Sequence, residues 1–93
     1  MILHHIQTSP GNDNALATSL KYAAKDDSFV LSGNGVTAVL KRQWSMALSP
    51  FKVYLLADDV SARGLAPHTA GYPLIDYQDF VALTLSHDKI ITW

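Results

Sequence analysis

The side chains best placed to do chemistry are carboxylates that follow apolar segments. An apolar run over residues 52–57 stops at Asp58 and Asp59, and a second short run stops at Asp76, three residues before Asp79. Paired carboxylates can act as general acid and base, but at a helix start they also satisfy free N–H groups and the helix dipole. We therefore expect Asp58 or Asp59, and Asp76, to cap helices. If they share one sheet edge, Asp58, Asp59 and Asp76 form an acidic rim that repels phosphate ligands.

The sequence contains no cysteine. In open α/β sheets, ligands bind at the carboxyl ends of the strands, where the following helix would also lower the pKa of a reactive thiol. Met1 and Met46 are thioethers, and they cannot replace a thiolate as a nucleophile. This chain therefore cannot perform thiol chemistry, and it can form no disulfide.

Four histidines raise the question of a metal site. His4 and His5 are adjacent in a predicted strand, so their side chains should point to opposite faces of the sheet. His68 and His87 lack the H-x₃₋₅-H spacing of zinc ligands. We predict no metal site and no cofactor.

The remaining motifs give no better candidate for catalysis. Gly33-Asn34-Gly35 lacks the third glycine and the lysine of a phosphate-binding loop, so a strand-to-helix turn explains it better. Ser9 and Ser61 do not lie in a G-x-S-x-G elbow. Trp44 and Trp93 have no interleaved basic residues, which favours packing or subunit contact over base stacking. We predict no catalytic residue in the chain.

The composition is that of a small folded domain with an excess of apolar residues, some of which we expect to contact other chains. Of its 93 residues, 48% are hydrophobic and only 16% are charged, against about 25% charged in an average domain. The net charge of −1 disfavours direct nucleic-acid binding and recruitment to a membrane by a basic patch. The sequence shows no signal-peptide pattern and no run of membrane-spanning length, so we expect a single cytoplasmic domain over residues 1–93.

Apolar runs alternate with helical stretches along the whole chain, which is typical of βαβ units and a mainly parallel sheet. We expect five strands, at residues 2–6, 28–32, 52–57, 73–75 and 89–92, and about four helices. The first helix should start at a cap provided by Asn12 or Asp13, and the third should end at Gly64. Residues 41–50 have no legible pattern.

The last helix has a clear apolar arc. At 100° per residue, its predicted core face comprises Tyr77, Phe80, Val81, Thr84 and Leu85. Leu83 falls outside that arc, and we take Leu83 and Trp44 as candidate contacts with a partner chain.

Several short segments carry a family resemblance. They are Leu3-His4 with Ser9-Pro10, then Gly35-Val36-Thr37-Ala38, then Lys52-Val53-Tyr54 with Asp59 and Ala62-Arg63-Gly64-Leu65, and finally Ile75-Asp76-Tyr77 with Asp79-Phe80-Val81, His87 and Trp93. In this order and spacing, over nearly the whole chain, they resemble the TusB/DsrH family. The resemblance implies a three-layer α/β/α sandwich of the DsrEFH-like type with a five-stranded, mainly parallel sheet.

The resemblance also implies a function in sulfur transfer. Such proteins assemble with TusC-like and TusD-like subunits into a heterohexamer in the bacterial cytoplasm. There, a persulfide sulfur is passed to a cysteine of the D-type subunit and ends in 2-thiouridine at the wobble position of certain tRNAs. DsrH-type members commonly carry a cysteine early in the chain. Its absence here favours the Tus branch and leaves no catalytic residue to transfer.

Two alternatives remain open from the sequence. One is a DsrH-like subunit that serves sulfur oxidation. The other is a stand-alone α/β protein that binds a small molecule at the carboxyl edge, near Asp58, Asp59 and Asp76. The apolar excess also makes a homo-oligomer plausible when the chain is isolated.

Overall fold

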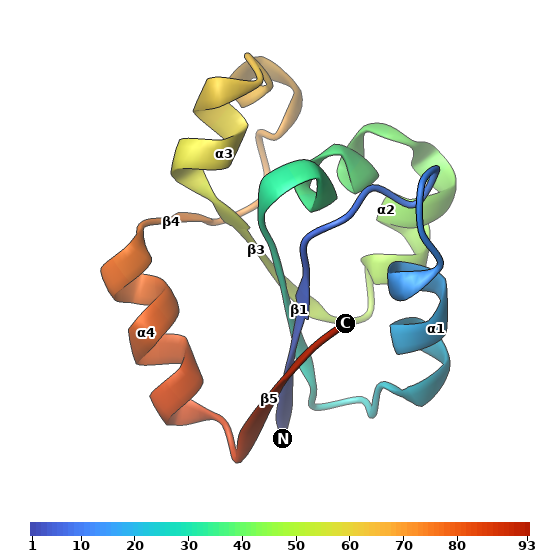
Figure 1. The fold of residues 1–93 in the computed structure, drawn as a ribbon, viewed down its shortest axis with the longest axis vertical. Helices are drawn as coiled ribbons and strands as arrows, with labels where there is room; N and C mark the ends of the chain where they lie inside the picture. Colours follow the sequence, from blue (N-terminus) through green and yellow to red (C-terminus); the bar gives the residue numbers. More distant parts are fainter.

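Five parallel strands form one sheet in the order β4-β3-β2-β1-β5 (Figure 1). The computed structural model describes residues 1–93. The strands are β1 (Ile2–Ile6), β2 (Ser28–Leu31), β3 (Lys52–Leu56), β4 (Leu74–Ile75) and β5 (Lys89–Thr92). The predicted five-stranded parallel sheet is confirmed, with strand bounds within one residue of those expected.

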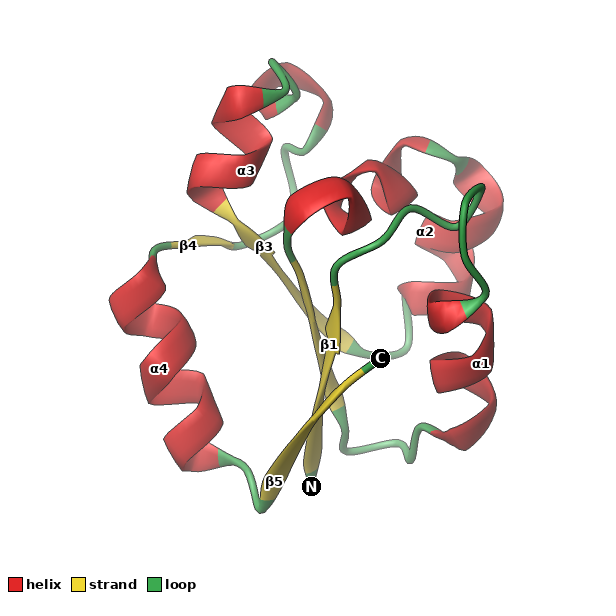
Figure 2. Cartoon of the chain, viewed as in Figure 1, coloured by secondary structure: helices red, strands yellow, loops and turns green.

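The helices lie in two unequal layers (Figure 2). They are α1 (Ala15–Tyr22), the 3₁₀ helix η1 (Gly33–Leu40), α2 (Arg42–Leu48), α3 (Ala57–Ala62), the 3₁₀ helix η2 (Ala66–His68) and α4 (Tyr77–Ser86). The chain steps from β1 to β4 in one direction and then returns across the sheet to β5. Since parallel crossovers are right-handed, the return connection through α4 covers the opposite face from α1 and α2. The three-layer α/β/α sandwich is thereby confirmed.

The hydrophobic core is also divided unequally between the two faces of the sheet. The main cluster of eleven buried residues lies between the sheet and α1, η1 and α2, and includes Leu16, Phe29, Val36 and Leu55. On the other face, a smaller cluster of Leu3, Val30 and Ile75 is covered by α4. No helix in the structure is both long and apolar enough to cross a bilayer.

The segment without a legible pattern forms α2, and its Trp44 is half-buried against the main cluster. Before it, η1 crosses very close to β1. A Cβ built on Gly35 would lie 2.5 Å from the Ile6 carbonyl oxygen, so only glycine fits there without a shift.

The predicted cap of the first helix is wrong. α1 begins at Ala15 after Asn14, which makes no side-chain cap bond. The Ser9 carbonyl accepts from the N–H groups of Asn12 and Asp13 at 3.1 and 3.2 Å, which forms a turn and delays the start of the helix. Asp13 instead accepts from the Asn14 N–H at 2.7 Å.

The cap of the last helix is as expected, but its predicted core face is right for Phe80 and wrong for Tyr77, Val81 and Leu85. Asp76 and Asp79 form a reciprocal capping box. However, Phe80 and Leu83 pack against the smaller cluster, whereas Tyr77, Val81 and Leu85 are 71%, 45% and 82% exposed. The rest of the apolar arc points outward because the tertiary attachments of α4, among them the Phe80 ring 4.9 Å from that of His5, fix its rotation.

Candidate functional site

The segments after β2 and β3 meet at the carboxyl edge of the sheet and are joined by Asp59. Its Oδ2 accepts from the N–H of Gly33, the first residue of η1, at 2.7 Å. α3 begins at Ala57 directly after Leu56 and has no side-chain cap, so the expected capping of this helix by Asp58 or Asp59 is wrong. Instead, Asp59 satisfies an N–H group at the start of a different helix.

Arg63 completes this junction. Its guanidinium donates to Asn34 Oδ1 through Nε at 3.1 Å and through Nη2 at 2.9 Å. Nη1 donates to the Asp59 carbonyl at 3.1 Å and lies 3.7 Å from its carboxylate. The arginine therefore offsets the charge of Asp59 and fastens the turn after β2 to α3.

The three residues of the expected acidic rim have different surroundings. Asp58 is exposed in the first turn of α3, Asp59 is half-buried at the junction with Gly33, and Asp76 caps α4. All three follow the neighbouring strands β3 and β4. None of the four cavities in the structure is lined by any of them, so the small-molecule alternative has no cavity beside these three carboxylates.

A histidine–serine pair at the same edge was missed by the sequence reasoning. His5 Nε2 lies 2.7 Å from Ser32 Oγ, and both side chains are buried. Burial lowers the pKa of His5. Such a pair is the core of a nucleophilic serine site, but Phe80 covers the imidazole and no cavity reaches either residue. The signal available in the sequence was the polar residue His5 inside an apolar strand.

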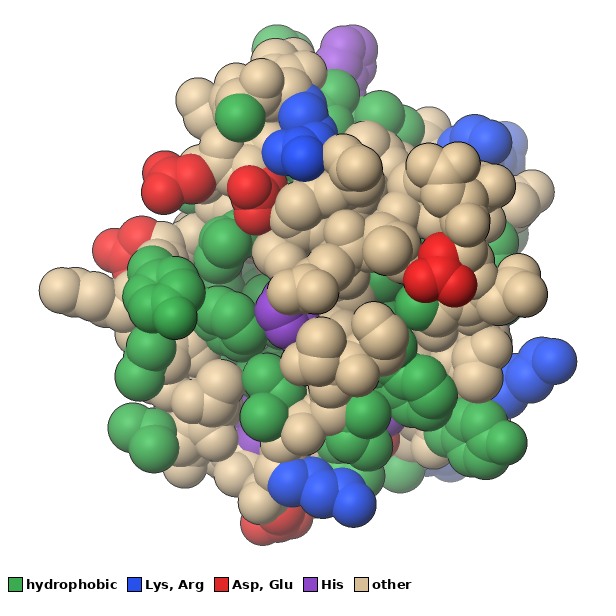
Figure 3. Space-filling view, viewed as in Figure 1, with side chains coloured by type: hydrophobic (Ala, Val, Ile, Leu, Met, Phe, Trp, Pro, Cys, Tyr) green, Lys and Arg blue, Asp and Glu red, His purple; other side chains and the backbone are tan.

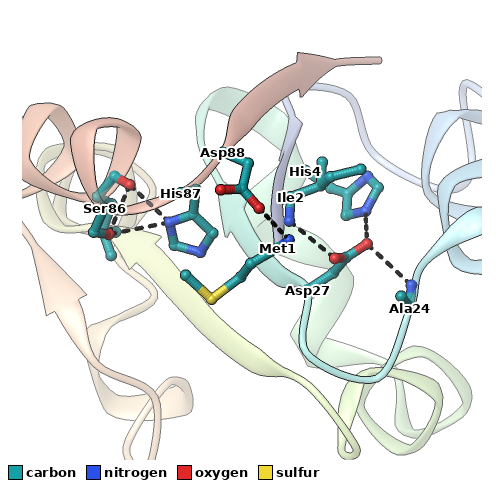
Figure 4. A network of polar contacts seen from close by, with 9 residues as sticks. Met1, Ile2, His4, Ala24, Asp27, Ser86, His87 and Asp88 are labelled. Atoms are coloured by element: carbon teal, nitrogen blue, oxygen red, sulfur yellow. Dashed lines mark hydrogen bonds and ion pairs between the residues drawn. The ribbon is translucent and has the colours of Figure 1, made fainter.

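His4 lies on the opposite face of the sheet, as its adjacency to His5 predicted: His4 stacks on Phe29 of the main cluster, whereas His5 contacts Phe80 over the smaller one. Figure 4 shows the surroundings of His4, with its ring next to Asp27. The indole Nε1 of Trp93 donates to His4 Nδ1 at 3.0 Å. Since an indole N–H can only donate, Nδ1 is the accepting nitrogen and the proton is on Nε2. Nε2 donates to Asp27 Oδ2 at 2.9 Å. His4 is therefore one link in a buried chain of hydrogen bonds.

Asp27 is the centre of this network. It also accepts from the N–H groups of Ile2 at 2.9 Å and Ala24 at 3.0 Å. Burial alone would raise the pKa of the Asp27 carboxyl, but the hydrogen bonds from Ala24, His4 and Ile2 outweigh burial and lower it. A carboxylate held by three donors serves to join the ends of β1, α1 and the C-terminus. No group of three or more potential metal-ligating side chains converges anywhere in the structure.

Most of the exposed apolar surface does not belong to Leu83 or Trp44, the two partner contacts predicted from the sequence. Leu83 and Trp44 are half-buried and pack against the molecule's own clusters. Hydrophobic side chains instead gather over α4 (Figure 3). We call Tyr77, Val81 and Leu85 the α4 ridge, because their spacing of four residues aligns them along the exposed side of this helix. α4 contains no lysine or arginine.

Comparison with known proteins finds relatives over nearly the whole chain. A family model described as "DsrH like protein" matches residues 8–90. Protein TusB of Buchnera aphidicola subsp. Acyrthosiphon pisum is 36% identical in an alignment 96 residues long, which covers 99% of this chain and all of the relative. Protein TusB of Escherichia coli strain K12 is 35% identical with the same coverage.

Solved structures agree on the fold. The crystal structure of the ychN protein from E. coli superimposes with a TM-score of 0.82 at 22% identity, over 99% of this chain and 97% of that one. The solution structure of Tm0979 from Thermotoga maritima gives a TM-score of 0.70 at 29% identity, over 96% and 97%.

Proposed function

The chain belongs to the TusB/DsrH family, and on this basis we propose that it is a non-catalytic subunit of a TusBCD-like sulfur-relay complex that supports 2-thiolation of the tRNA wobble uridine in the bacterial cytoplasm. Sulfur relay needs a thiolate that attacks a sulfane sulfur and then holds it covalently. The sequence has no cysteine, so the relay thiolate belongs to another subunit. The contribution of this chain is assembly.

The α4 ridge is the observation that carries the proposal. Tyr77 and Leu85 leave most of their surface in water, and Val81 nearly half, although α4 has a second, inward side that anchors it. Fully burying such side chains contributes about 1.5–3 kcal/mol each. Because the ridge bears no charge, covering it with a TusC-like or TusD-like subunit requires no desolvation of an ion.

Assembly through one subunit face also explains the low charge of the chain. Surface covered in a complex does not need charged groups for solubility, and the centres of interfaces are depleted in them. The 16% charged content and the uncharged ridge are both in line with this.

Co-expression with the TusC-like and TusD-like relatives of the same bacterium tests the proposal. We expect all three chains to co-purify as one complex, and we expect deletion of this chain to lower 2-thiouridine at the wobble position. A chain that stays a monomer or homodimer in the presence of both relatives would contradict the assembly function. Assembly with unchanged 2-thiouridine would remove the tRNA assignment in favour of a DsrH-like function in sulfur oxidation.

A further inference from the structure

The edge of the sheet at β3 is only half covered. β3 has five residues, whereas β4 has two and pairs only with Leu55 and Leu56 (Figure 2). Residues 52–54 therefore have a neighbouring strand on the β2 side alone. The uncovered length corresponds to about three residues of extended chain, or about 10 Å.

The backbone of Val53 points into this uncovered length. The N–H of Leu55 donates to the Pro73 carbonyl at 3.0 Å, so Leu55 directs its backbone groups toward β4. In a strand, residues two apart direct these groups to the same side, so Val53 does the same. Pro73 has no N–H to offer its carbonyl, and the N–H of Tyr72 is already bonded to Thr69 at 3.1 Å. Val53 thus presents one free donor and one free acceptor at the sheet edge.

A groove of about 510 Å³ lies against the same segment. Its walls include the apolar side chains of Leu48, Phe51 and Tyr72, and Lys52 is the one charged residue among its lining residues. The chain turns away from β3 at Gly71, whose φ of +99° is a value that glycine adopts readily and other residues rarely do. This turn keeps residues 70–72 from continuing β4 alongside Val53, and the groove occupies the space.

We propose that this groove binds a short extended segment of another polypeptide, which adds to the sheet as a strand beside Val53. The segment accepts from the Val53 N–H and donates to the Val53 carbonyl, as in other cases of strand addition. One of its apolar side chains lies between Phe51 and Tyr72, and an acidic group of the segment faces Lys52. This inference goes beyond the proposed function and does not rest on it.

The geometry favours a tail or loop over a second copy of the chain. Pro73 and β4 close one end of the open length, so a long strand belonging to another sheet would collide with them. Two or three residues of a flexible segment fit without that collision. The volume of the groove lies within the range of pockets that bind small ligands, so it has room for apolar side chains of such a segment.

Selection from a library of random linear heptapeptides tests the proposal. The wild-type chain is the bait, and Ala70→Trp, which fills the groove, is the comparison. Ala66→Trp is the matched control, because Ala66 is also exposed but does not line the groove. We expect enriched peptides to carry alternating apolar residues with an acidic residue, and to bind Ala70→Trp at least tenfold more weakly than Ala66→Trp. Thermal unfolding of both variants establishes that they fold.

Amide NMR then locates the enriched peptides. We expect their binding to shift the Val53 amide and slow its hydrogen exchange, and we expect N-methylation of the central peptide residue to abolish binding. No enrichment, equal binding to Ala70→Trp, or equal binding of the N-methylated peptide would each overturn the proposal. A concentration-dependent shift of the Val53 amide without peptide would assign the edge to a second copy, and would also overturn it.

Discussion

Trp93 Nε1 and His4 Nδ1 are hydrogen-bonded at 3.0 Å although 89 residues separate them. The bond joins Trp93 to β1, the strand between β2 and β5, and through His4 it reaches Asp27, the residue before β2. The ring of His4 also stacks on Phe29, with ring centroids 5.0 Å apart. The C-terminus is therefore part of the folded core, and changes there should affect global stability.

Trp93→Phe should destabilise the chain by about 1–3 kcal/mol, because it leaves the buried Nδ1 of His4 without a donor. Urea denaturation gives the free energy of unfolding. Trp44→Phe is the matched control, since Trp44 is half-buried but its indole makes no hydrogen bond. Equal losses in the two variants would show that ring size, and not the bond to His4, accounts for the effect.

His5 should make stability depend on pH. Burial lowers its pKa in the folded chain below the ordinary value of 6.5. Between the folded pKa and 6.5, the unfolded chain binds more protons, so the free energy of unfolding falls as the pH is lowered through this window. Above 6.5 the contribution is fully present. NMR titration of the His5 ring and urea denaturation at pH 5 to 8 measure both quantities.

His5→Gln should flatten this pH profile, whereas His68→Gln should leave it unchanged because His68 is exposed. A His5 ring that titrates at or above 6.5 would disprove the assignment.

Gly35→Ala should be strongly destabilising. The added Cβ would lie 2.5 Å from the Ile6 carbonyl oxygen, and relieving such overpacking costs about 1–3 kcal/mol or more. Gly11→Ala meets no atom within 4 Å and serves as the control. We expect a clear fall in Tm for the first variant and almost none for the second. Similar Tm values would mean that η1 can move away from β1 at no cost.

Leu85→Asp and Leu83→Asp should separate assembly from folding. Leu85 is 82% exposed on the α4 ridge, so its replacement should leave the Tm of the isolated chain nearly unchanged and prevent co-purification with the partner subunits. Leu83 packs against the cluster of Leu3, Val30 and Ile75, so its replacement should lower the Tm. A complex that survives Leu85→Asp would exclude the ridge as the interface.

Local chemistry allowed much of the fold to be predicted. The strands at residues 2–6 and 89–92 were identified within one residue because apolar runs and turn formers depend only on neighbouring positions. The capping box of Asp76 and Asp79 was recognisable for the same reason, since its two residues are three positions apart. The lack of a thiol is likewise a property of the sequence alone.

The tertiary structure decided everything that depends on residues distant in the chain. The bond from Gly33 to Asp59 and the pairing of His5 with Ser32 join residues 26 and 27 positions apart, and the sheet order likewise depends on pairing between strands that are distant in the chain. The rotation of α4 is the clearest case, because the helical period marks the most apolar arc but not which side meets the sheet. α4 is attached through Phe80, at one margin of that arc, and through Leu83, just outside it, and this rotation leaves Tyr77, Val81 and Leu85 exposed.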